Sequence, residues 1–254
     1  MNFGNTVLIT GAAKRIGRDI AVGLSRDGWN VVVHYNNSSA EADGVVESIK
    51  DNGGKAYAVS ADLADEDQAQ GLIRQASELA GPITCLINNA SLFEKDTFET
   101  VSHETWDAHM QVNLRSPFVL TQSFARQLPE GLEGNVINMI DQRVWNLTPH
   151  FMSYTLSKAG LWTLTRTLAL ALAPAVRVNA IGPGPVLPSS RQTEEAFIEQ
   201  WSSLPLRRNV QTGEIVDAVR FILDASSMTG QMIALDGGQH LGWAQGTQND
   251  DQLE

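Results

Sequence analysis

Cysteine and basic residues are scarce in this 254-residue chain, and each scarcity excludes a class of function. Cys85 is the only cysteine, which excludes an internal disulfide and a thiolate-rich metal site, and its apolar neighbours predict a buried, inert thiol. Lys and Arg number 18 against 29 Asp and Glu, for a net charge of −11. Nucleic acids and anionic membranes require clustered cations, so we expect a small-molecule substrate, no nucleic-acid partner and no metal.

Long apolar runs are absent as well. The most apolar stretch runs from Leu161 to Ala175, contains Arg166 and follows Lys158, so it is too short and too polar to span a bilayer. Residues 1–5 show neither the basic nor the apolar region of a secretion signal. We therefore expect a cytoplasmic protein with no membrane partner.

Seven runs of β-branched and aliphatic residues alternate with segments of helical periodicity. The runs predict strands at residues 7–10, 31–35, 56–60, 85–88, 136–140, 176–181 and 232–235, and the other segments predict helices at 16–27, 40–52, 65–79, 102–128, 151–172 and 212–223. The strands are apolar on both faces, as in a parallel sheet that helices cover on each side. The sequence therefore predicts a single doubly wound Rossmann-type α/β domain over residues 1–254, with a seven-stranded parallel sheet. Residues 182–191 form a candidate lid, and residues 243–254 a flexible tail.

A glycine-rich turn follows the first expected strand. Gly11 and Gly17 flank Lys14, Arg15 and Ile16 where the strand leads into a helix. Such a turn brings backbone N–H groups and the positive end of the helix dipole to a pyrophosphate. Glycines at this spacing also occur in plain tight connections, but their place after the first strand favours a dinucleotide site.

The end of the second expected strand indicates which dinucleotide binds. Sites selective for NAD carry an acidic residue about 20 positions beyond the glycines. Here residues 34–39 read His-Tyr-Asn-Asn-Ser-Ser, and no carboxylate appears before Glu41. We therefore expect NADP(H). The same polar residues would also form a turn and cap the next helix through Ser38 or Ser39, and the two roles are compatible. The expected cofactor ligands here are Lys14, His34, Asn36 and Ser38.

Polar or small residues also follow the third and fourth expected strands. Asp62 and Leu63 follow the third, where a carboxylate can accept from an adenine amino group. Asn89 and Ala90 follow the fourth, where small and amide residues let the strand end approach a nicotinamide ribose. Each pair alone is ordinary loop chemistry. Their shared position at consecutive strand ends indicates a ligand edge.

A second cluster is suited to moving a proton. Tyr154 and Lys158 are four residues apart in a helical segment, so both project from one face, and Asp141 ends the preceding strand. The lysine ammonium favours the phenolate, which predicts a Tyr154 pKa below the usual value of about 10 and a role as general acid. The alternative is a core-lining tyrosine beside a lysine that caps the helix. Asn113, within another helical segment, is expected to bend that helix and to position a water in a proton chain.

These residues resemble those of the short-chain dehydrogenase/reductase superfamily. The resemblance runs from about Thr6 to Leu241 and includes Pro183, Gly184 and the closing Leu-Asp-Gly-Gly at 235–238. It implies a cofactor contact at Pro183 and Gly184, catalytic roles for Tyr154 and Lys158, and a homotetramer.

Two departures from the common superfamily pattern narrow the resemblance. Arg15 stands where the middle glycine is usual, and Asp141 stands where a catalytic serine is usual. Pteridine reductases and bacterial dihydromonapterin reductases share both departures. Similarity to that group implies that Arg15 contacts the pterin and a cofactor phosphate, that Phe93 stacks the pterin ring against the nicotinamide, and that Ser91 lies beside both. The expected substrate contacts are Arg15, Ser91, Phe93, Asp141 and Tyr154.

The predicted function is therefore NADPH-dependent reduction of a dihydropterin. Hydride would add to C6 of the ring and a proton to N5, delivered through Asp141 and Tyr154, while a flat ring suits an aromatic face and a carboxylate. Two alternatives stay open: a carbonyl reductase acting on ketones, and a non-enzymatic NADP sensor. The helices at 102–128 and 151–172 are apolar over much of their circumference, which favours packing against further copies of the chain.

Overall fold

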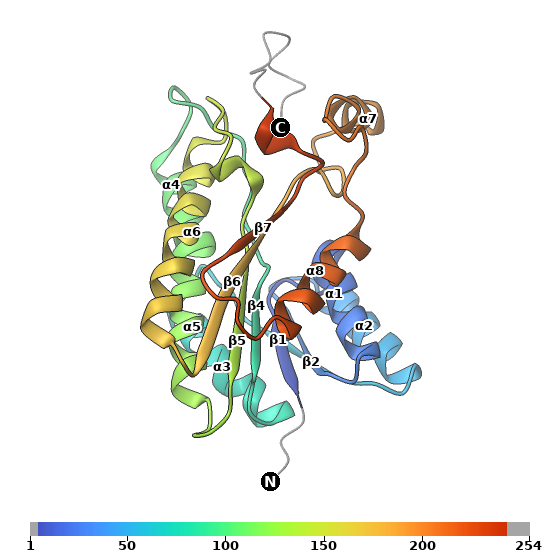
Figure 1. Cartoon of the computed structure of the whole chain (residues 1–254), viewed down its shortest axis with the longest axis vertical. Coiled ribbons are helices and arrows are strands. Elements are labelled where there is room, and N and C mark those ends of the chain that lie inside the picture. The colour runs from blue at the N-terminus through green and yellow to red at the C-terminus, as the bar shows by residue number, and fades with distance from the viewer. Residues whose placement is uncertain (1–4, 243–254) are drawn as a thin grey trace.

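The computed structural model describes residues 5–242, in which helices flank a central sheet (Figure 1). All seven strands are parallel, in the order β3-β2-β1-β4-β5-β6-β7. They are β1 (Thr6–Ile9), β2 (Asn30–Tyr35), β3 (Lys55–Ser60), β4 (Cys85–Asn88), β5 (Gly134–Met139), β6 (Val176–Pro183) and β7 (Met232–Leu235). The predicted seven-stranded parallel sheet is therefore confirmed.

Helices cover both faces of this sheet (Figure 1). One face is covered by α1 (Arg15–Arg26), α2 (Ser39–Asp51) and α8 (Thr212–Asp224). The other is covered by α3 (Glu66–Ala80), α5 (Ser116–Gln127) and α6 (Met152–Leu172). The doubly wound α/β architecture follows, as predicted.

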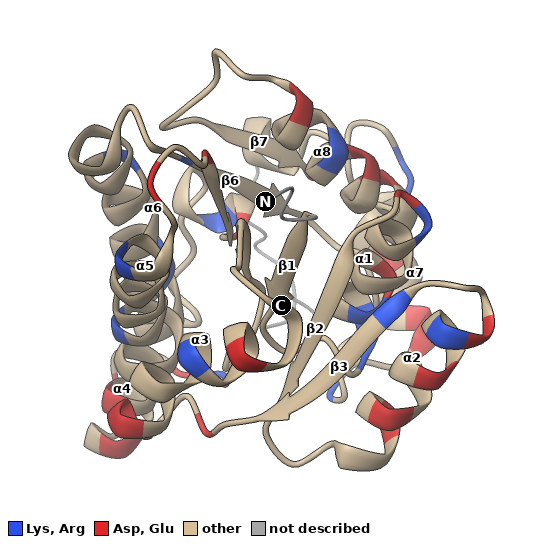
Figure 2. Ribbon diagram, turned by 90° about the horizontal axis from the view of Figure 1, so that it is seen from below, with Lys and Arg blue, Asp and Glu red and all other residues tan. Residues whose placement is uncertain are grey.

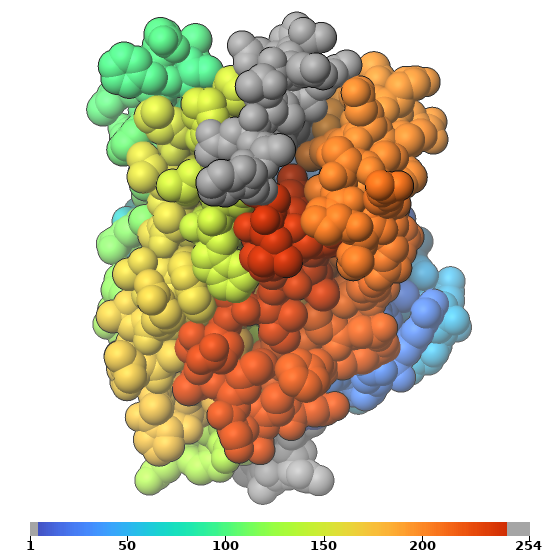
Figure 3. All heavy atoms as spheres, turned by 45° about the horizontal axis from the view of Figure 1, so that its top comes forward, coloured from blue at the N-terminus to red at the C-terminus, as the bar shows by residue number. Residues whose placement is uncertain are grey.

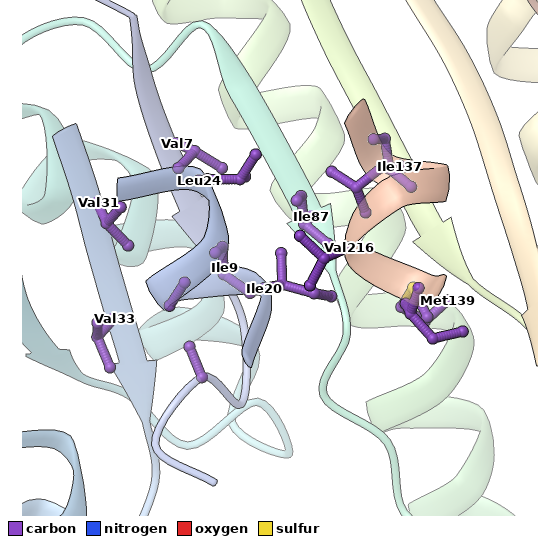
Figure 4. Packing of buried hydrophobic residues seen from close by; sticks show 14 of the residues in the cluster. Val7, Ile9, Ile20, Leu24, Val31, Val33, Ile87, Ile137, Met139 and Val216 are labelled. Atoms are coloured by element: carbon purple, nitrogen blue, oxygen red, sulfur yellow. The ribbon is translucent and has the colours of Figure 1, made fainter. Parts of the chain in front are cut away.

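Alternating strand residues fill two cores, one on each side of the sheet. Val7 and Ile9 of β1 face α1 and α8, while Leu8 between them faces α3 and α5. Ile20 and Leu24, four residues apart on α1, pack against the first of these faces, as Figure 4 shows. Each such fully buried aliphatic side chain contributes about 1.5–3 kcal/mol to folding.

The helix predicted at 102–128 is interrupted. The chain forms α4 (His103–Met110), then a π-helical turn η1 (Gln111–Arg115), then α5. Ser102 caps α4 through its side chain, which accepts from the N–H of Thr105 at 3.1 Å. The π turn widens the helix around Asn113, so the predicted bend at this asparagine coincides with a real departure from α-helical geometry.

Helix α7 (Glu194–Ser202) was not predicted, because the irregular sequence before it hides its period. Thr193 caps it by accepting from the N–H of Ala196 at 3.2 Å, and Phe197 is its only buried residue. The candidate lid at 182–191 is therefore the irregular lead into this helix, and its first two residues belong to β6. Two 3-10 turns complete the described chain, η2 (Gln142–Val144) and η3 (Gln239–Leu241). The predicted flexible tail at 243–254 lies outside the described residues.

Charged side chains lie mainly on helices and loops, and the inner strands carry few (Figure 2). Cys85 is fully buried, and burial raises the pKa of its thiol far above the ordinary value, which confirms the inert cysteine. None of the helices in residues 5–242 has the length and apolar character needed to cross a bilayer.

Candidate active site

The glycine-rich turn follows β1, which pairs with β2 on one side and with β4 on the other. The order in which the chain adds strands to the sheet reverses at this point. Ligands of open parallel sheets bind at the carboxyl ends of strands at such a point. Gly11 has a positive φ of 63°, and a Cβ there would meet Ala90 Cα at 3.1 Å. A Cβ on Gly17 would lie 2.4 Å from the Gly11 carbonyl oxygen. Only glycine fits both positions.

The start of α1 is suited to an anion. Its N-cap residue, Lys14, provides no side-chain hydrogen bond to the first turn. The first backbone N–H groups of a helix have no acceptor within the helix, and the helix dipole adds positive potential there. The turn at residues 11–17 therefore meets the requirements of a pyrophosphate site.

Thr10 and Asn89 lock the ends of β1 and β4 together. The Thr10 hydroxyl accepts from the N–H groups of Asn89 and Ala90, each at 2.9 Å. The Asn89 amide donates to the carbonyls of Thr10 at 2.8 Å and Gly11 at 3.2 Å. Asn89 and Ala90 thus lie against the glycine-rich turn, where the sequence predicted a cofactor contact.

His34 lies beneath the turn, only 2% exposed. Its Nδ1 accepts the N–H of Gly11 at 3.0 Å, so the neutral ring carries its proton on Nε2, which donates to the Ala61 carbonyl at 3.0 Å. Burial lowers the His34 pKa to about 4. Both ring nitrogens are used by the protein, so His34 supports the turn in place of the predicted contact with the cofactor.

The other residues predicted to contact the ribose or the adenine are Lys14, Asn36, Ser38, Asp62 and Leu63, and all but Leu63 are at least partly exposed. Lys14 pairs with Glu41 at 2.6 Å, with about half of each side chain exposed. Ser38 is the N-cap residue of α2, at one of the two positions predicted for the cap, but its side chain makes no capping hydrogen bond. Asn36 is exposed, and Asp62 follows β3 with Oδ1 accepting from the N–H of Ala64 at 2.9 Å. Leu63 is buried.

Tyr154, Asp141 and Lys158 do converge. The Tyr154 hydroxyl donates to Asp141 Oδ2 at 3.0 Å, and Asp141 Oδ1 accepts the N–H of Arg143 at 2.8 Å. Lys158 is buried and its Nζ donates to the Met139 carbonyl at 2.8 Å. The predicted catalytic constellation is thus assembled at the end of β5 and the start of α6.

The protonation of this cluster differs from the prediction. Burial and the negative charge of Asp141 raise the Tyr154 pKa well above its ordinary value. Burial lowers the pKa of Lys158 to about 8. The predicted fall in the Tyr154 pKa is therefore wrong, because Lys158 points its ammonium at a backbone carbonyl while the phenol faces a carboxylate. Tyr154 therefore keeps its proton at neutral pH.

Asn113 anchors the loop that follows β4. Its Oδ1 accepts from the Leu92 N–H at 2.8 Å and from the Ser91 hydroxyl at 3.2 Å, and its Nδ2 donates to the Leu92 carbonyl and the Ser157 hydroxyl. These four bonds engage the whole amide. The side chain is therefore committed to holding Ser91 and its neighbours on α6, which leaves it no bond for the predicted water.

Phe93 lies beside the proton-handling cluster. Its ring meets that of Tyr154 edge-on, with centroids 4.7 Å apart, and stacks on Phe151 at 4.5 Å. Phe151 precedes α6 with a left-handed φ of 57°. The guanidinium of Arg191 lies 5.1 Å from the Phe93 ring centroid, and Arg191 also donates to the Phe93 carbonyl at 3.1 Å. An aromatic side chain thus lies next to the phenol, and the stacking of Phe93 on a pterin ring stays a prediction.

Arg15 connects the glycine-rich turn to the segment after β6. It has a left-handed φ of 54° and donates to the carbonyls of Pro188 at 2.9 Å and Leu187 at 3.2 Å. Pro183 ends β6 and Gly184 begins that segment, and a Cβ on Gly184 would lie 2.7 Å from Asp236 Cα. Helix α7 and helix α6 stand on either side of the chain after β7 at this end of the molecule (Figure 3).

These elements enclose a cleft of about 230 Å³. The predicted site residues that line it are Arg15, Ile16, Asn89, Ser91, Phe93, Asp141, Tyr154, Lys158, Pro183 and Gly184. The cleft therefore extends from the glycine-rich turn to the cluster of Asp141, Tyr154 and Lys158.

Three buried residues near the cleft were missed by sequence reasoning. The His109 Nε2 accepts the N–H of Glu94 at 3.1 Å, so its Nδ1 donates to the Ser153 hydroxyl at 2.7 Å. That hydroxyl in turn donates to Asp96. The three residues fix the loop of Phe93 to the start of α6. They are too far apart in sequence for any local pattern to reveal them.

Comparisons with known proteins agree with this geometry. A family profile described as Enoyl-(Acyl carrier protein) reductase matches residues 11–240. The chain is 36% identical over 246 residues to an uncharacterized oxidoreductase of Methylorubrum extorquens, covering 92% of this chain and 97% of that protein. It is 30% identical to the 3-oxoacyl-[acyl-carrier-protein] reductase FabG of Staphylococcus aureus, covering 95% and 100%. It is 32% identical to Glucose 1-dehydrogenase 2 of Bacillus subtilis, covering 94% and 95%.

Solved structures include a more similar sequence. The crystal structure of FolM Alternative dihydrofolate reductase 1 from Brucella canis, complexed with NADP, shares 48% identity, with a TM-score of 0.90 over 94% of this chain and 95% of that chain. A blue fluorescent protein from a metagenomic library, in complex with NADPH, shares 28% identity and a TM-score of 0.85 over 94% and 99%.

Proposed function

The chain belongs to the short-chain dehydrogenase/reductase family, and from that premise we propose that it is an NADPH-dependent reductase of dihydropterins. One observation carries the proposal: the Tyr154 hydroxyl bonds to Asp141 at 3.0 Å in a cleft that Phe93 also lines. The similarity to a FolM reductase at 48% identity supports it.

The residues of the turn fit a phosphate-bearing dinucleotide. The uncapped start of α1 would hold the pyrophosphate, and the locked ends of β1 and β4 would receive the nicotinamide ribose at Asn89 and Ala90. Lys14, released from Glu41, would bind the 2′-phosphate, with Asn36 and Ser38 nearby. The FolM neighbour was solved with NADP, which supports this choice of cofactor. NADPH supplies a hydride to the substrate when bound.

The chain's own residues supply the proton and the orientation. Reducing the imine of a 7,8-dihydropterin requires a hydride at C6 and a proton at N5. We assign the proton donor for N5 to Tyr154 Oη, because this phenol lines the cleft and carries its proton at neutral pH. Asp141 holds the phenol and relays the next proton to it. Phe93 provides a flat face for the ring, and Arg15 binds its polar edge beside the phosphate turn.

The test compares NADPH consumption with dihydrobiopterin in the natural protein, in Tyr154→Phe and in the matched variant Tyr57→Phe. Tyr57 lies on β3, at the far edge of the sheet, outside the cleft. We expect a fall in kcat of about 100-fold or more in Tyr154→Phe and no change in Tyr57→Phe. Equal activity in all three proteins would refute the assigned proton donor.

A second candidate is a carbonyl reductase acting on ketones. It is favoured by the sequence relatives, which include a 3-oxoacyl-[acyl-carrier-protein] reductase and a glucose dehydrogenase. Phe93 and Arg15 count against it, because a small ketone needs neither a stacking face nor an arginine at the phosphate turn. A panel of ketones assayed beside dihydrobiopterin distinguishes the two. Turnover of ketones alone would overturn the pterin proposal.

We also propose a homotetramer. A cavity of about 770 Å³ opens between α4, η1, α5 and α6, lined by Met110, Leu114, Phe118 and Leu164 among others. On α6, Leu161 is buried within the chain, whereas Leu168 and Leu172 are only partly covered. Closed symmetry is the usual way to cover such a face. A monomeric mass by light scattering would contradict the assembly.

A further inference from the structure

Two side chains that line the cleft carry polar atoms without partners. Gln142 and Arg143 directly follow Asp141 in the turn η2, and they are only 4% and 5% exposed. Gln142 Oε1 and Arg143 Nε make no hydrogen bond. Buried polar atoms of native proteins are nearly always paired, so each exception calls for a reason. Neither residue has a role in the mechanism above.

Within residues 5–242 the Arg143 side chain makes one hydrogen bond, and its buried Nε has no acceptor. Its Nη1 donates to the Thr148 hydroxyl at 3.1 Å, and its guanidinium lies 4.9 Å from the Phe151 ring centroid. Within residues 5–242 it makes no ion pair, although it is a buried cation. Burying a guanidinium without a full set of acceptors costs free energy. A ligand that brings an acceptor would recover that cost.

The surroundings indicate where such a ligand would lie. Phe151, under the Arg143 guanidinium, stacks on Phe93, and Phe93 meets Tyr154 edge-on. Arg143 also lies close enough to Tyr154 for its charge to lower the pKa of that phenol in part. Gln142 and Arg143 therefore lie beside the position proposed for the pterin ring, next to Asp141.

The two buried atoms without hydrogen bonds, Gln142 Oε1 and Arg143 Nε, indicate which functional group of a ligand would bind there. Gln142 offers an acceptor and Arg143 a donor, and a hydroxyl group both donates and accepts. A carboxylate only accepts, so it would leave Gln142 Oε1 without a donor. We propose that Gln142 and Arg143 bind the hydroxyl groups of a hydroxyalkyl side chain on the pterin ring. This inference rests on the proposed function, and it makes the two residues the determinants of specificity among dihydropterins.

The experiment measures kcat/KM for three substrates that share the ring. Dihydrobiopterin carries a dihydroxypropyl side chain, 6-methyl-7,8-dihydropterin carries no hydroxyl, and 7,8-dihydrofolate carries an anionic tail. The variants are Gln142→Leu and Arg143→Met, which keep most of the side-chain volume. Arg166→Met is the matched control, because the Arg166 guanidinium also lies on an aromatic ring, Trp162, but outside the cleft.

We expect Gln142→Leu to lower kcat/KM for dihydrobiopterin about tenfold, the effect of one lost neutral hydrogen bond, and Arg143→Met to lower it about tenfold or more, because its bond involves a charged group. Activity of Gln142→Leu on the 6-methyl substrate should stay within about twofold of the natural protein. Arg143→Met should lose less activity on the 6-methyl substrate than on dihydrobiopterin, because the lost charge also acts on Tyr154. Arg166→Met should change neither value. Retained activity on the 6-methyl substrate also shows that the variants fold.

Other outcomes overturn the inference. An equal loss on dihydrobiopterin and the 6-methyl substrate would mean that the residues bind the shared ring. A loss confined to dihydrofolate would mean that Arg143 binds a carboxylate. If Arg143→Met does not fold, Gln142→Leu alone decides between these outcomes. If the natural protein reduces none of the three, the proposed function itself fails; if it reduces them and the variants show no selective loss, this inference alone fails.

Discussion

The neutral state of His34 makes stability depend on pH in a way that can be measured. Its Nδ1 accepts the Gly11 N–H, so a protonated ring would place two N–H groups against each other. The perturbation is therefore His34→Gln, which removes the titrating group. Its matched control is His103→Gln, because the side chain of His103 is 86% exposed.

The size of the effect follows from the lowered pKa. His34 titrates near 4 in the folded chain and at 6.5 when unfolded. Between these values the unfolded chain binds the proton and the folded chain does not, so stability rises with pH across this window. Each pH unit corresponds to about 1.4 kcal/mol, so the full difference is about 3 kcal/mol. About 2 kcal/mol of it is lost between pH 8 and pH 5.

The assay is urea unfolding at pH 8 and at pH 5 for the three proteins. The natural protein and His103→Gln should lose about 2 kcal/mol more on acidification than His34→Gln loses, since only His34→Gln lacks the buried imidazole with the lowered pKa. His34→Gln should also be less stable than the natural protein at pH 8, because the support of Gly11 is weakened. The same loss on acidification in all three proteins would refute the assigned role of His34.

Two further predictions concern stability. Ser153→Ala removes the hydroxyl that links His109 to Asp96, so urea unfolding should show a free energy of unfolding about 1–3 kcal/mol lower. Ser203→Ala, at an exposed serine, should show no measurable loss. Equal values for the two variants would contradict the network. Gly184→Ala places a Cβ 2.7 Å from Asp236 Cα and should cost about 1–3 kcal/mol, whereas Gly44→Ala, with open space in the middle of α2, should gain about 1 kcal/mol in thermal unfolding. A stable Gly184→Ala would show that the β7 end can move.

The layout of the fold was predictable because apolar periodicity survives in the sequence. Each of the seven strands lies within two residues of its predicted run, since a sheet covered on both faces leaves few polar positions within the strands. The break between α4 and α5 was not predictable in detail, because the π turn at Asn113 depends on bonds to Leu92 and Ser157 from other segments. Helix α7 buries only Phe197, so its apolar period is too weak to read.

The site was predictable where it depends on position in the fold. Tyr154, Asp141 and Phe93 come together because strand ends and the start of α6 share one edge of the sheet. Their charge states depend instead on burial and on partners that only coordinates reveal. For this reason the direction of the Tyr154 pKa was predicted wrongly, and His34 was placed at the cofactor although its ring is bonded below the turn.

The bonds between Thr10 and Asn89 also constrain how this protein can be re-engineered. The side chain of each residue hydrogen-bonds to backbone groups at the end of the other strand. These bonds hold the two strand ends together, although Thr10 and Asn89 are 79 positions apart in the chain. A turn transplanted from residues 10–17 alone would leave the carbonyls of Thr10 and Gly11 without the Asn89 side-chain amide that donates to them. A chimera that exchanges cofactor preference must therefore carry residues 88–90 together with the turn.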